Sequence, residues 1–410
     1  MPVEAIFFNV GQGDCTLLWF YDRGVDPATG KGTHAILIDC GSSGAVAPMT
    51  PPTGAKGNAS ALMVAHLKAK LANYLERLDN PRTLDALIIT HPDKDHFNLL
   101  HKVLLDATGK LAYTIKALYY TLDPMEYREG GGTFMKDLLT DPDTLTSPAG
   151  HKVEERPIAM DPQTEPLPLL SRDTSRANLL MLGGSWYGDG VIHGRKGPKR
   201  KRVEYTKEEI ANQSSLVTVL QGERDSGGKR QRVLLMGDAV DITEMLLMGF
   251  DKKKDWMGRQ SNLWLKMGHH GSATSTCDEW IEHTTPDGLF VSTGMLQFSG
   301  ASTTFTEANI RGRVLPTWKR VRGANGIADP VVTARSRIYG YQPTADPKQI
   351  WAVSTTQGVF SNFCEPGMAF PQPAELDKPL LAGNRDAWRG ADWHLRLDHP
   401  TDGTYSIHAE

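Results

Sequence analysis

Short apolar runs separated by turn residues dominate the first forty positions of the chain. Residues 4–10 and 15–20 are apolar segments on either side of a glycine-containing turn, and residues 35–38 form a third. Segments of this length, bounded by Gly and Asp, are typical of β-strands. The pattern therefore predicts that the chain opens with a β-meander of three strands.

The hydrophobic period then changes. After a loop rich in Pro, Gly and Ser at about residues 42–60, apolar residues recur at spacings of three and four between residues 64 and 78. This spacing predicts an amphipathic helix. An apolar run at residues 84–90 predicts a buried strand, and residues 99–104 predict a second helix. Alternation of this kind is typical of a layered α/β protein.

Strand and helix patterns return after a weakly patterned segment at about 123–210, which we interpret as insertions. A helix is predicted at residues 243–248. Strands are predicted at 215–220, 232–236, 263–267, 289–292, 349–354, 393–397 and 405–408. The sequence thus predicts a core domain over residues 1–300 and a β-rich C-terminal extension over 301–410 that packs on it.

The composition narrows the class of protein. Hydrophobic residues make up 40% and charged residues 23% of the 410 positions, as in globular proteins. A formal net charge of −3 provides no overall attraction to polyanions, so nucleic-acid binding requires a local basic patch. The four cysteines are far apart, and the sequence shows neither a signal peptide nor a membrane span. We therefore expect a cytoplasmic protein without a membrane partner.

The densest group of potential metal ligands follows the strand predicted at 84–90. It reads His91-x-Asp93-x-Asp95-His96, four imidazole or carboxylate groups in six residues. In an extended loop, alternate side chains point the same way, so three of them can converge while the adjacent His96 points toward a second ion. Imidazole suits zinc, whereas carboxylate suits manganese or magnesium, so the group predicts a divalent metal without deciding which. A solvated polar loop is the alternative interpretation.

Two further polar positions follow predicted strands in the second half. Asp238 comes after a glycine, and taken alone it fits a helix N-cap as well as a metal bridge. His269 and His270 stand between two glycines, where one imidazole can bind metal while the other contacts substrate. Lys266 and Ser272 beside this pair can touch a phosphate or can be solvated.

A basic run lies within the segment interpreted as insertions. It holds six cationic residues in eight positions, and glutamates nearby can neutralise it. Such a run can contact a phosphate backbone, and it can equally be a solvated loop. The candidate nucleic-acid-binding residues are Arg195, Lys196, Lys199, Arg200, Lys201 and Arg202.

Together, these motifs resemble the metallo-β-lactamase superfamily, and within it the ComEC-type hydrolase domain of DNA uptake. The matching segments stand in the family's order within residues 4–300. They are Asn9-Val-Gly-Gln-Gly-Asp14, Leu37-Ile-Asp-Cys-Gly41, Thr90-His-Pro-Asp-Lys-Asp-His96, Leu234-Leu-Met-Gly-Asp238 and Lys266-Met-Gly-His-His-Gly-Ser272, with Asn212-x-x-Ser215-Leu-Val as a looser sixth. The resemblance implies an α/β fold, a four-layer αββα sandwich.

The resemblance also implies a site for two divalent ions, zinc or manganese, with a one-ion site as the alternative. The implied ligands are His91 and Asp93 for one ion, Asp95 and His96 for the other, Asp238 as bridge, and His269 or His270 to complete the set. Asp14 and Asp39 would support the site. The chain departs from the superfamily's usual pattern in three places. Asp93 stands where most members have a histidine, as in the ComEC-like branch. The chain also lacks a convincing counterpart of the separate histidine before the Gly-Asp, and Phe97-Asn98-Leu99 replaces a common glycine pair.

Three functions are compatible with these motifs. A metal-activated hydroxide that attacks a phosphodiester, with Asp95, His270 and Lys266 as candidate catalytic residues, predicts a nuclease or phosphodiesterase. Its partner would be nucleic acid or another phosphodiester. Hydrolysis of a small ester, thioester, lactone or cyclic nucleotide is the alternative, and a narrow apolar pocket would favour it. A regulatory module with a degenerate metal site is the third.

Overall fold

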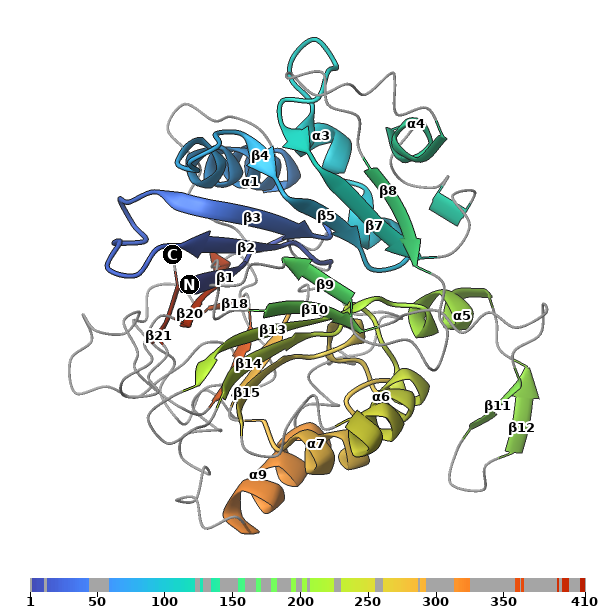
Figure 1. Ribbon diagram of the computed structural model, residues 1–410. Helices are drawn as coiled ribbons and strands as arrows, with labels where there is room; N and C mark the ends of the chain where they lie inside the picture. The colour runs from blue at the N-terminus through green and yellow to red at the C-terminus, as the bar shows by residue number, and fades with distance from the viewer. Residues whose placement is uncertain are drawn as a thin grey trace.

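Two β-sheets lie face to face in the computed structural model, with helices on both outer faces (Figure 1). The structure describes residues 2–10, 13–43, 59–121, 126–127, 134–140, 154–158, 167–170, 178–182, 193–196, 201–204, 207–224, 230–254, 261–286, 288–292, 313–324, 358–361, 363–364, 389–390, 393–397 and 406–409. The four-layer αββα arrangement implied by the motifs is confirmed.

The first sheet holds both ends of the described chain. From edge to edge it runs β21 (Ser406–Ala409), β20 (Trp393–Leu397), β1 (Val3–Phe7), β2 (Thr16–Tyr21), β3 (Gly32–Ile38), β5 (Ala86–Ile89), β7 (Ala117–Thr121) and β8 (Glu154–Ile158). Strands β1 to β3 pair antiparallel, which confirms the predicted meander. From β3 to β8 the neighbours are parallel.

The second sheet is built from the later part of the chain. It runs β17 (Gly358–Ser361), β16 (Gly288–Val291), β15 (Ser261–Lys266), β14 (Arg230–Leu235), β13 (Val217–Arg224), β10 (Asn178–Leu182) and β9 (Leu167–Leu170). From β14 to β17 the neighbouring strands pair parallel, whereas β14 pairs antiparallel with β13. The short pairs are β4 (Thr83–Leu84) with β6 (Thr114–Ile115), β11 (His193–Lys196) with β12 (Lys201–Glu204), and β18 (Phe363–Cys364) with β19 (Arg389–Gly390).

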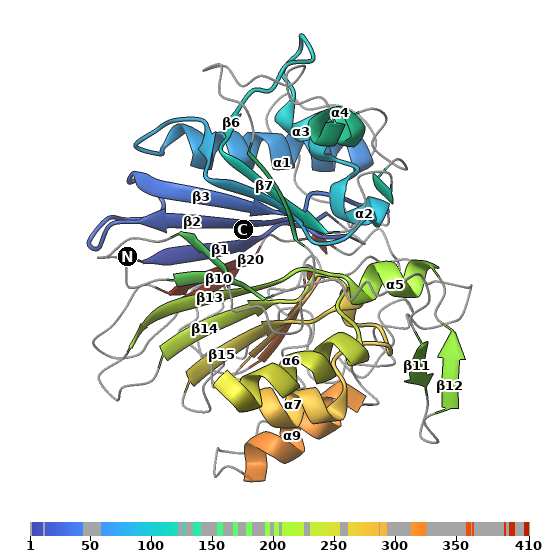
Figure 2. The same cartoon turned by 45° about the vertical axis from the view of Figure 1, so that its right-hand side comes forward.

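Helices cover the outer face of each sheet (Figures 1 and 2). On the first sheet they are α1 (Ala59–Glu76), α3 (Leu100–Leu104) and α4 (Phe134–Thr140), and on the second α6 (Asp241–Lys254), α7 (Asp278–Thr284) and α9 (Leu315–Ala324). The predicted helices within 64–78, 99–104 and 243–248 are thus confirmed. Two short helices, α2 (Lys94–Phe97) and α5 (Lys207–Gln213), stand near strand ends.

The alternation of side chains along each strand builds three apolar layers. In β2, Leu17 and Trp19 pack toward the helices, whereas Leu18 and Phe20 pack toward the second sheet. Side chains of a strand point alternately to its two faces, so a strand covered on both sides is apolar throughout. A third cluster, around Trp280 and Trp318, fills the space between the second sheet and its helices.

Two parts of the chain contribute to the sheets in ways that the sequence pattern does not predict. The segment at about 123–210, predicted to consist of insertions, also supplies β8 to the first sheet and β9 and β10 to the second. In the region 301–410, β20 pairs with β1 and β17 with β16. The strand expected at 349–354 lies outside the described residues, and the boundary at residue 300 stays a prediction. Across the residues described, no helix is both long and apolar enough to cross a membrane.

Candidate metal centre

The polar motifs all follow the carboxyl ends of strands, and those ends meet along one edge of the sandwich. Asp39 follows β3, His91 follows β5, Asp238 follows β14 and His270 follows β15. Parallel neighbours end at the same edge of their sheet, which explains how residues far apart in sequence share one place. One local expectation was wrong: the polar cluster is extended only as far as Asp93, because α2 begins at Lys94.

Backbone hydrogen bonds hold the three N-terminal loops together. The amide of Asp14 donates to the Asp95 carbonyl (3.1 Å), and the amide of Cys40 donates to the His96 carbonyl (2.7 Å). The Gly41 amide donates to the Asp14 carbonyl (3.0 Å), which joins the loop after β3 to the loop after β1. The position of the α2 side chains therefore depends on two other loops.

Asn98, which lies in the segment that replaces the family's common glycine pair, makes a contact that a glycine could not make. Its amide side chain accepts a hydrogen bond from the Ser42 amide (2.9 Å) and donates one to the Ser42 carbonyl (2.7 Å). This two-point contact joins the end of α2 to the loop after β3. A glycine has no side chain that can form it.

Gly41 lies where a side chain has no room. A Cβ added there would overlap backbone atoms of Asp95 and His96. We expect Gly41→Ala to lower the free energy of unfolding by about 1–3 kcal/mol, the usual cost of overpacking, and to weaken metal binding because both side chains must shift. Denaturant unfolding and metal titration of the same protein measure the two effects.

Gly249 provides the matched control. It is exposed on α6, and an added Cβ there meets no atom of the described residues within contact distance. Gly249→Ala should raise the free energy of unfolding by about 0.5–1 kcal/mol, because alanine favours the helix. A Gly41→Ala protein that is as stable as Gly249→Ala would contradict the packing described here.

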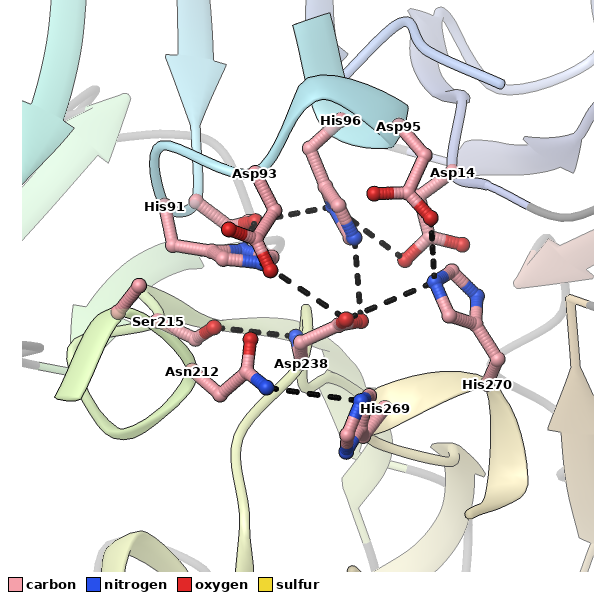
Figure 3. Close-up of polar contacts among 12 residues, drawn as sticks. Asp14, His91, Asp93, Asp95, His96, Asn212, Ser215, Asp238, His269 and His270 are labelled. Atoms are coloured by element: carbon pink, nitrogen blue, oxygen red, sulfur yellow. Dashed lines mark hydrogen bonds and ion pairs between the residues drawn. The ribbon is translucent and has the colours of Figure 1, made fainter. Parts of the chain in front are cut away.

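Asp238 lies at the centre of the cluster, between three imidazoles (Figure 3). Its carboxylate oxygens lie 3.1 Å from Nε2 of His96, 3.5 Å from Nε2 of His270 and 3.7 Å from Nε2 of His91. Its own amide donates to Ser215 Oγ (3.1 Å). The helix that follows begins only at Asp241, so Asp238 is directed into the site and is not a cap.

Two smaller groups flank Asp238. On one side, His91 Nε2 lies 3.5 Å from Asp93. On the other, His270 Nε2 lies 3.4 Å from Asp95. Figure 3 shows these pairs on opposite sides of the Asp238 carboxylate, with His96 above it. The arrangement has two halves that share one carboxylate.

The tandem histidines face different surroundings. His270 is buried, and its Nδ1 donates to the Ser292 carbonyl (2.9 Å), which leaves Nε2 facing Asp95 and Asp238. His269 instead has Nδ1 at 2.6 Å from Thr274 Oγ1 and Nε2 at 3.5 Å from Asn212 Nδ2. The backbone at both residues has positive φ, 44° and 50°, which turns the two rings apart.

Asp39 holds His96 in place without reaching the centre. Its carboxylate accepts hydrogen bonds from the Thr90 amide (2.8 Å) and hydroxyl (2.7 Å), and it lies 2.8 Å from His96 Nδ1. A carboxylate accepts only, so Nδ1 donates its proton to Asp39, and Nε2 is the ring nitrogen that faces the centre. Metal-binding histidines are commonly oriented by such a carboxylate.

Comparison with known proteins gives the same fold. A family model of the Metallo-beta-lactamase superfamily matches residues 9–170. The fold is thus the metallo-β-lactamase fold. The match includes Asp14, Asp39 and the His91–His96 cluster, while Asp238 and His270 lie beyond its end. No curated protein matches the chain.

Two solved structures similar to this chain can be named. One is unliganded yeast PDE1, at 12% sequence identity and a TM-score of 0.37, with 80% of this chain and 96% of that chain covered. The other is a B3 metallo-beta-lactamase with an active-site glutamic acid, at 13% identity and a TM-score of 0.25, with 79% and 92% covered.

The electrostatics of the candidate metal centre favour positive charge. Burial opposes ionisation of each group, but the neighbouring opposite charges prevail over it. They lower the pKa of Asp95 to about 2 and raise the pKa of His270 to about 9. Similarly, the pKa of Asp238 falls well below 3.8 and that of His96 rises well above 6.5. A site that stabilises protonated imidazoles in this way suits a cation.

The donor set fits a divalent metal. Ligand atoms of His91, His96 and Asp238 lie within 4.8 Å of one another, as do those of Asp95, His96 and His270. His91 Nε2 is buried and makes no hydrogen bond within the described part of the chain. Superfamily members typically bind divalent ions through imidazole and carboxylate groups of this kind.

Lys266 does not lie where a phosphate could reach it easily. It is buried, and its ammonium group donates to the Asp14 carboxylate, which itself lies 4.0 Å from His96 Nδ1. The solvated alternative considered for Lys266 is therefore wrong, because only 3% of the residue is exposed. Ser272 caps the His-His turn, since its amide donates to the His269 carbonyl (2.8 Å).

The basic run forms part of the β11–β12 hairpin, which stands apart from the sandwich beyond α5 (Figures 1 and 2). The strand register sets Arg195 opposite Arg202 and Lys196 opposite Lys201. Lys199 and Arg200 lie outside the described residues. The backbone thus places a basic ribbon on the side of α5, and its binding role stays a prediction.

The sequence pattern does not single out Asn212, Ser215 and Thr90, although all three contact site residues. Asn212 and Ser215 belong to the looser sixth motif, which is the signal that could have identified them. Thr90 is marked in the sequence only by its place directly before His91. Hydroxyl and amide residues are common on protein surfaces, so their type alone does not mark a site.

Proposed function

We propose that this chain is a metal-dependent hydrolase that cleaves phosphodiesters, with nucleic acid as its substrate. One observation carries the proposal: Asp238 lies within 3.1–3.7 Å of three imidazole nitrogens that come from separate strand ends. Three buried imidazoles around a buried carboxylate are costly to assemble without a function. A shared cation explains their convergence.

The proposed centre has two halves joined by Asp238. His91 and Asp93 form one half, and Asp95, His96 and His270 form the other, with distances as described above. Divalent ions bound there would lower the pKa of a water molecule and neutralise charge on a phosphate under attack. Because the Nδ1 proton of His270 is bound to Ser292, the geometry favours a ligand role over proton donation for this histidine.

The choice of a phosphodiester rests on three observations. Asp93 replaces the imidazole that stands at this position in most superfamily members, and a carboxylate favours harder ions such as manganese, which also bind phosphate oxygens. The motifs resemble those of ComEC-type hydrolase domains. The β11–β12 hairpin carries a basic ribbon. Asp95 and His270, our candidate catalytic residues, are then proposed as ligands, while Lys266 balances the charge of Asp14.

The test is a substrate and metal screen of the full chain after treatment with EDTA. Mn²⁺, Zn²⁺ and Mg²⁺ are each added back with single-stranded DNA, plasmid DNA, RNA and bis(p-nitrophenyl) phosphate. A p-nitrophenyl ester, a thioester and a lactone form the second arm. We expect metal-dependent cleavage of the phosphodiesters, fastest with Mn²⁺ or Zn²⁺, because the ligands combine imidazole and carboxylate.

The basic hairpin distinguishes nucleic acid from a small phosphodiester. Replacing Lys201 and Arg202 with Ser should weaken DNA binding and flatten its salt dependence, while cleavage of bis(p-nitrophenyl) phosphate stays unchanged. Exposed Arg320 on α9, replaced in the same way, is the control for a lost cation elsewhere. Turnover of the esters alone, with every phosphodiester intact, would refute the proposed function.

A further inference from the structure

The half of the centre that contains His91 and Asp93 lacks the histidine that the family pattern leads one to expect. Sequence alone offers no convincing imidazole between the His/Asp cluster and Asp238. In the structure, a residue near the C-terminal end of α5 lies where this missing ligand would be needed. It is Asn212, whose side chain Figure 3 shows beside Ser215 and Asp238.

The position of Asn212 follows from contacts on both sides of it. The Ser215 amide donates to the Asn212 carbonyl (3.2 Å), and Ser215 Oγ accepts from the Asp238 amide (3.1 Å). The Leu216 amide donates to the Thr90 carbonyl (2.8 Å), which places this turn against the residue before His91. Asn212 therefore lies on the His91 and Asp93 side of Asp238, opposite His270 (Figure 3).

A relay of polar groups determines which way the Asn212 amide points. Thr274 Oγ1 donates to Ser272 Oγ (3.3 Å), so it accepts from His269 Nδ1 (2.6 Å). His269 Nε2 is then an acceptor, and the group that it meets at 3.5 Å is the NH2 of Asn212. The relay holds Nδ2 toward His269 and turns Oδ1 away from it.

The amide oxygen is buried and has no hydrogen-bond partner within the described residues. Asn212 as a whole is only 8% exposed. A buried carbonyl oxygen left unsatisfied costs free energy, and a cation is a partner that removes this cost. Carbonyl oxygens are ordinary ligands for manganese, magnesium and calcium.

We infer that Asn212 Oδ1 is a metal ligand in the half of the centre formed by His91, Asp93 and Asp238, and that His269 is the positioning residue that orients it. The inference rests on the proposed metal-dependent function and assigns the ligand that the missing histidine would have supplied. With one imidazole, two carboxylates and an amide oxygen, this half is the harder of the two and should prefer Mn²⁺ over Zn²⁺.

Isothermal titration of the EDTA-treated full chain with Mn²⁺, and separately with Zn²⁺, tests the assignment without using activity. We expect two Mn²⁺ ions per chain. Asn212→Leu, which keeps the side-chain shape but removes the oxygen, should weaken one of them by at least about 10- to 100-fold, the loss seen even for outer-shell partners. Asn212→His should restore binding of the second ion and move its preference toward Zn²⁺.

Ser214→Ala is the matched control at the same helix end, since Ser214 Oγ donates only to the Ala211 carbonyl in the described contacts (2.6 Å). It should bind both ions like the wild type. Thermal melting in EDTA verifies that each variant is folded. If Asn212→Leu binds Mn²⁺ with unchanged affinity and stoichiometry, the assignment is overturned. It is also overturned if this variant changes KM for a phosphodiester while its metal binding stays intact. Two bound ions with no cleavage of any phosphodiester would refute the proposed function while the ligand assignment stands.

Discussion

Asp238→Asn is expected to lower kcat/KM for phosphodiester cleavage by about 10³-fold or more, which corresponds to ~4 kcal/mol of transition-state stabilisation. The carboxylate lies within 3.7 Å of imidazoles from both halves of the centre, so its charge acts on every proposed ion position. An amide keeps the shape but removes the negative charge. Metal titration of the same variant should show weaker binding of both ions, because the shared ligand is lost.

Asp251→Asn provides the matched control for this result. Asp251 is also a buried aspartate bound to a histidine, His283 (2.8 Å), but it lies on α6 outside the centre. We expect this variant to keep wild-type kcat/KM and metal stoichiometry, whatever it costs in stability. Equal activity of Asp238→Asn and wild type would show that cleavage occurs elsewhere or comes from a contaminant.

Lys266→Met is expected to lower the free energy of unfolding of the metal-free protein by about 3–5 kcal/mol, the usual cost of removing one partner from a buried ion pair. Lys266 and Asp14 are 3% and 2% exposed, so the Asp14 carboxylate left behind would be buried without its cation. Urea unfolding in EDTA measures the effect. Lys266→Met combined with Asp14→Asn should cost less than the sum of the single changes, because no unpaired charge remains.

Lys116 is the matched lysine for this measurement. It forms an ion pair with Asp85 (2.6 Å), but its side chain is 49% exposed. Exposed ion pairs contribute little to stability, so Lys116→Met should lower the free energy of unfolding by no more than about 1 kcal/mol. If Lys266→Met and Lys116→Met lower the free energy of unfolding by the same small amount, the Lys266–Asp14 pair is accessible to water. Lys266 would then not balance the charge of Asp14 in the centre.

Much of the layered fold could be predicted from the sequence because strands and helices have local signatures. Strand β2, helix α1 and strand β14 were each expected from the spacing of apolar residues, and the structure confirms them. The region around β8, β9 and β10 could not be predicted in this way. Its apolar segments are short and interrupted by proline and glycine, and they become strands by pairing with β7 and β13.

The members of the candidate centre were also named from the sequence, because His and Asp in close spacing after a buried strand are uncommon except at sites. Several of their roles were implied by the resemblance alone and stay predictions, and others were left open. The sequence left His269 and His270 equivalent, and it treated Lys266 as a possible phosphate contact. The structure distinguishes them by direction: His270 faces Asp238, His269 faces Asn212, and Lys266 faces Asp14.

By itself, therefore, the sequence determined many of the strands and helices that carry the site, the strand-end position of the polar motifs and the chemical kind of site they can form. These features depend on residues within about ten positions of one another, as local propensity does. Only the tertiary structure decided which side chains meet, because a pair such as Lys266 and Asp14 is 252 residues apart along the chain and is brought together by the packing of two sheets. The amide orientation of Asn212, on which the metal preference of one half of the centre depends, belongs to this second class.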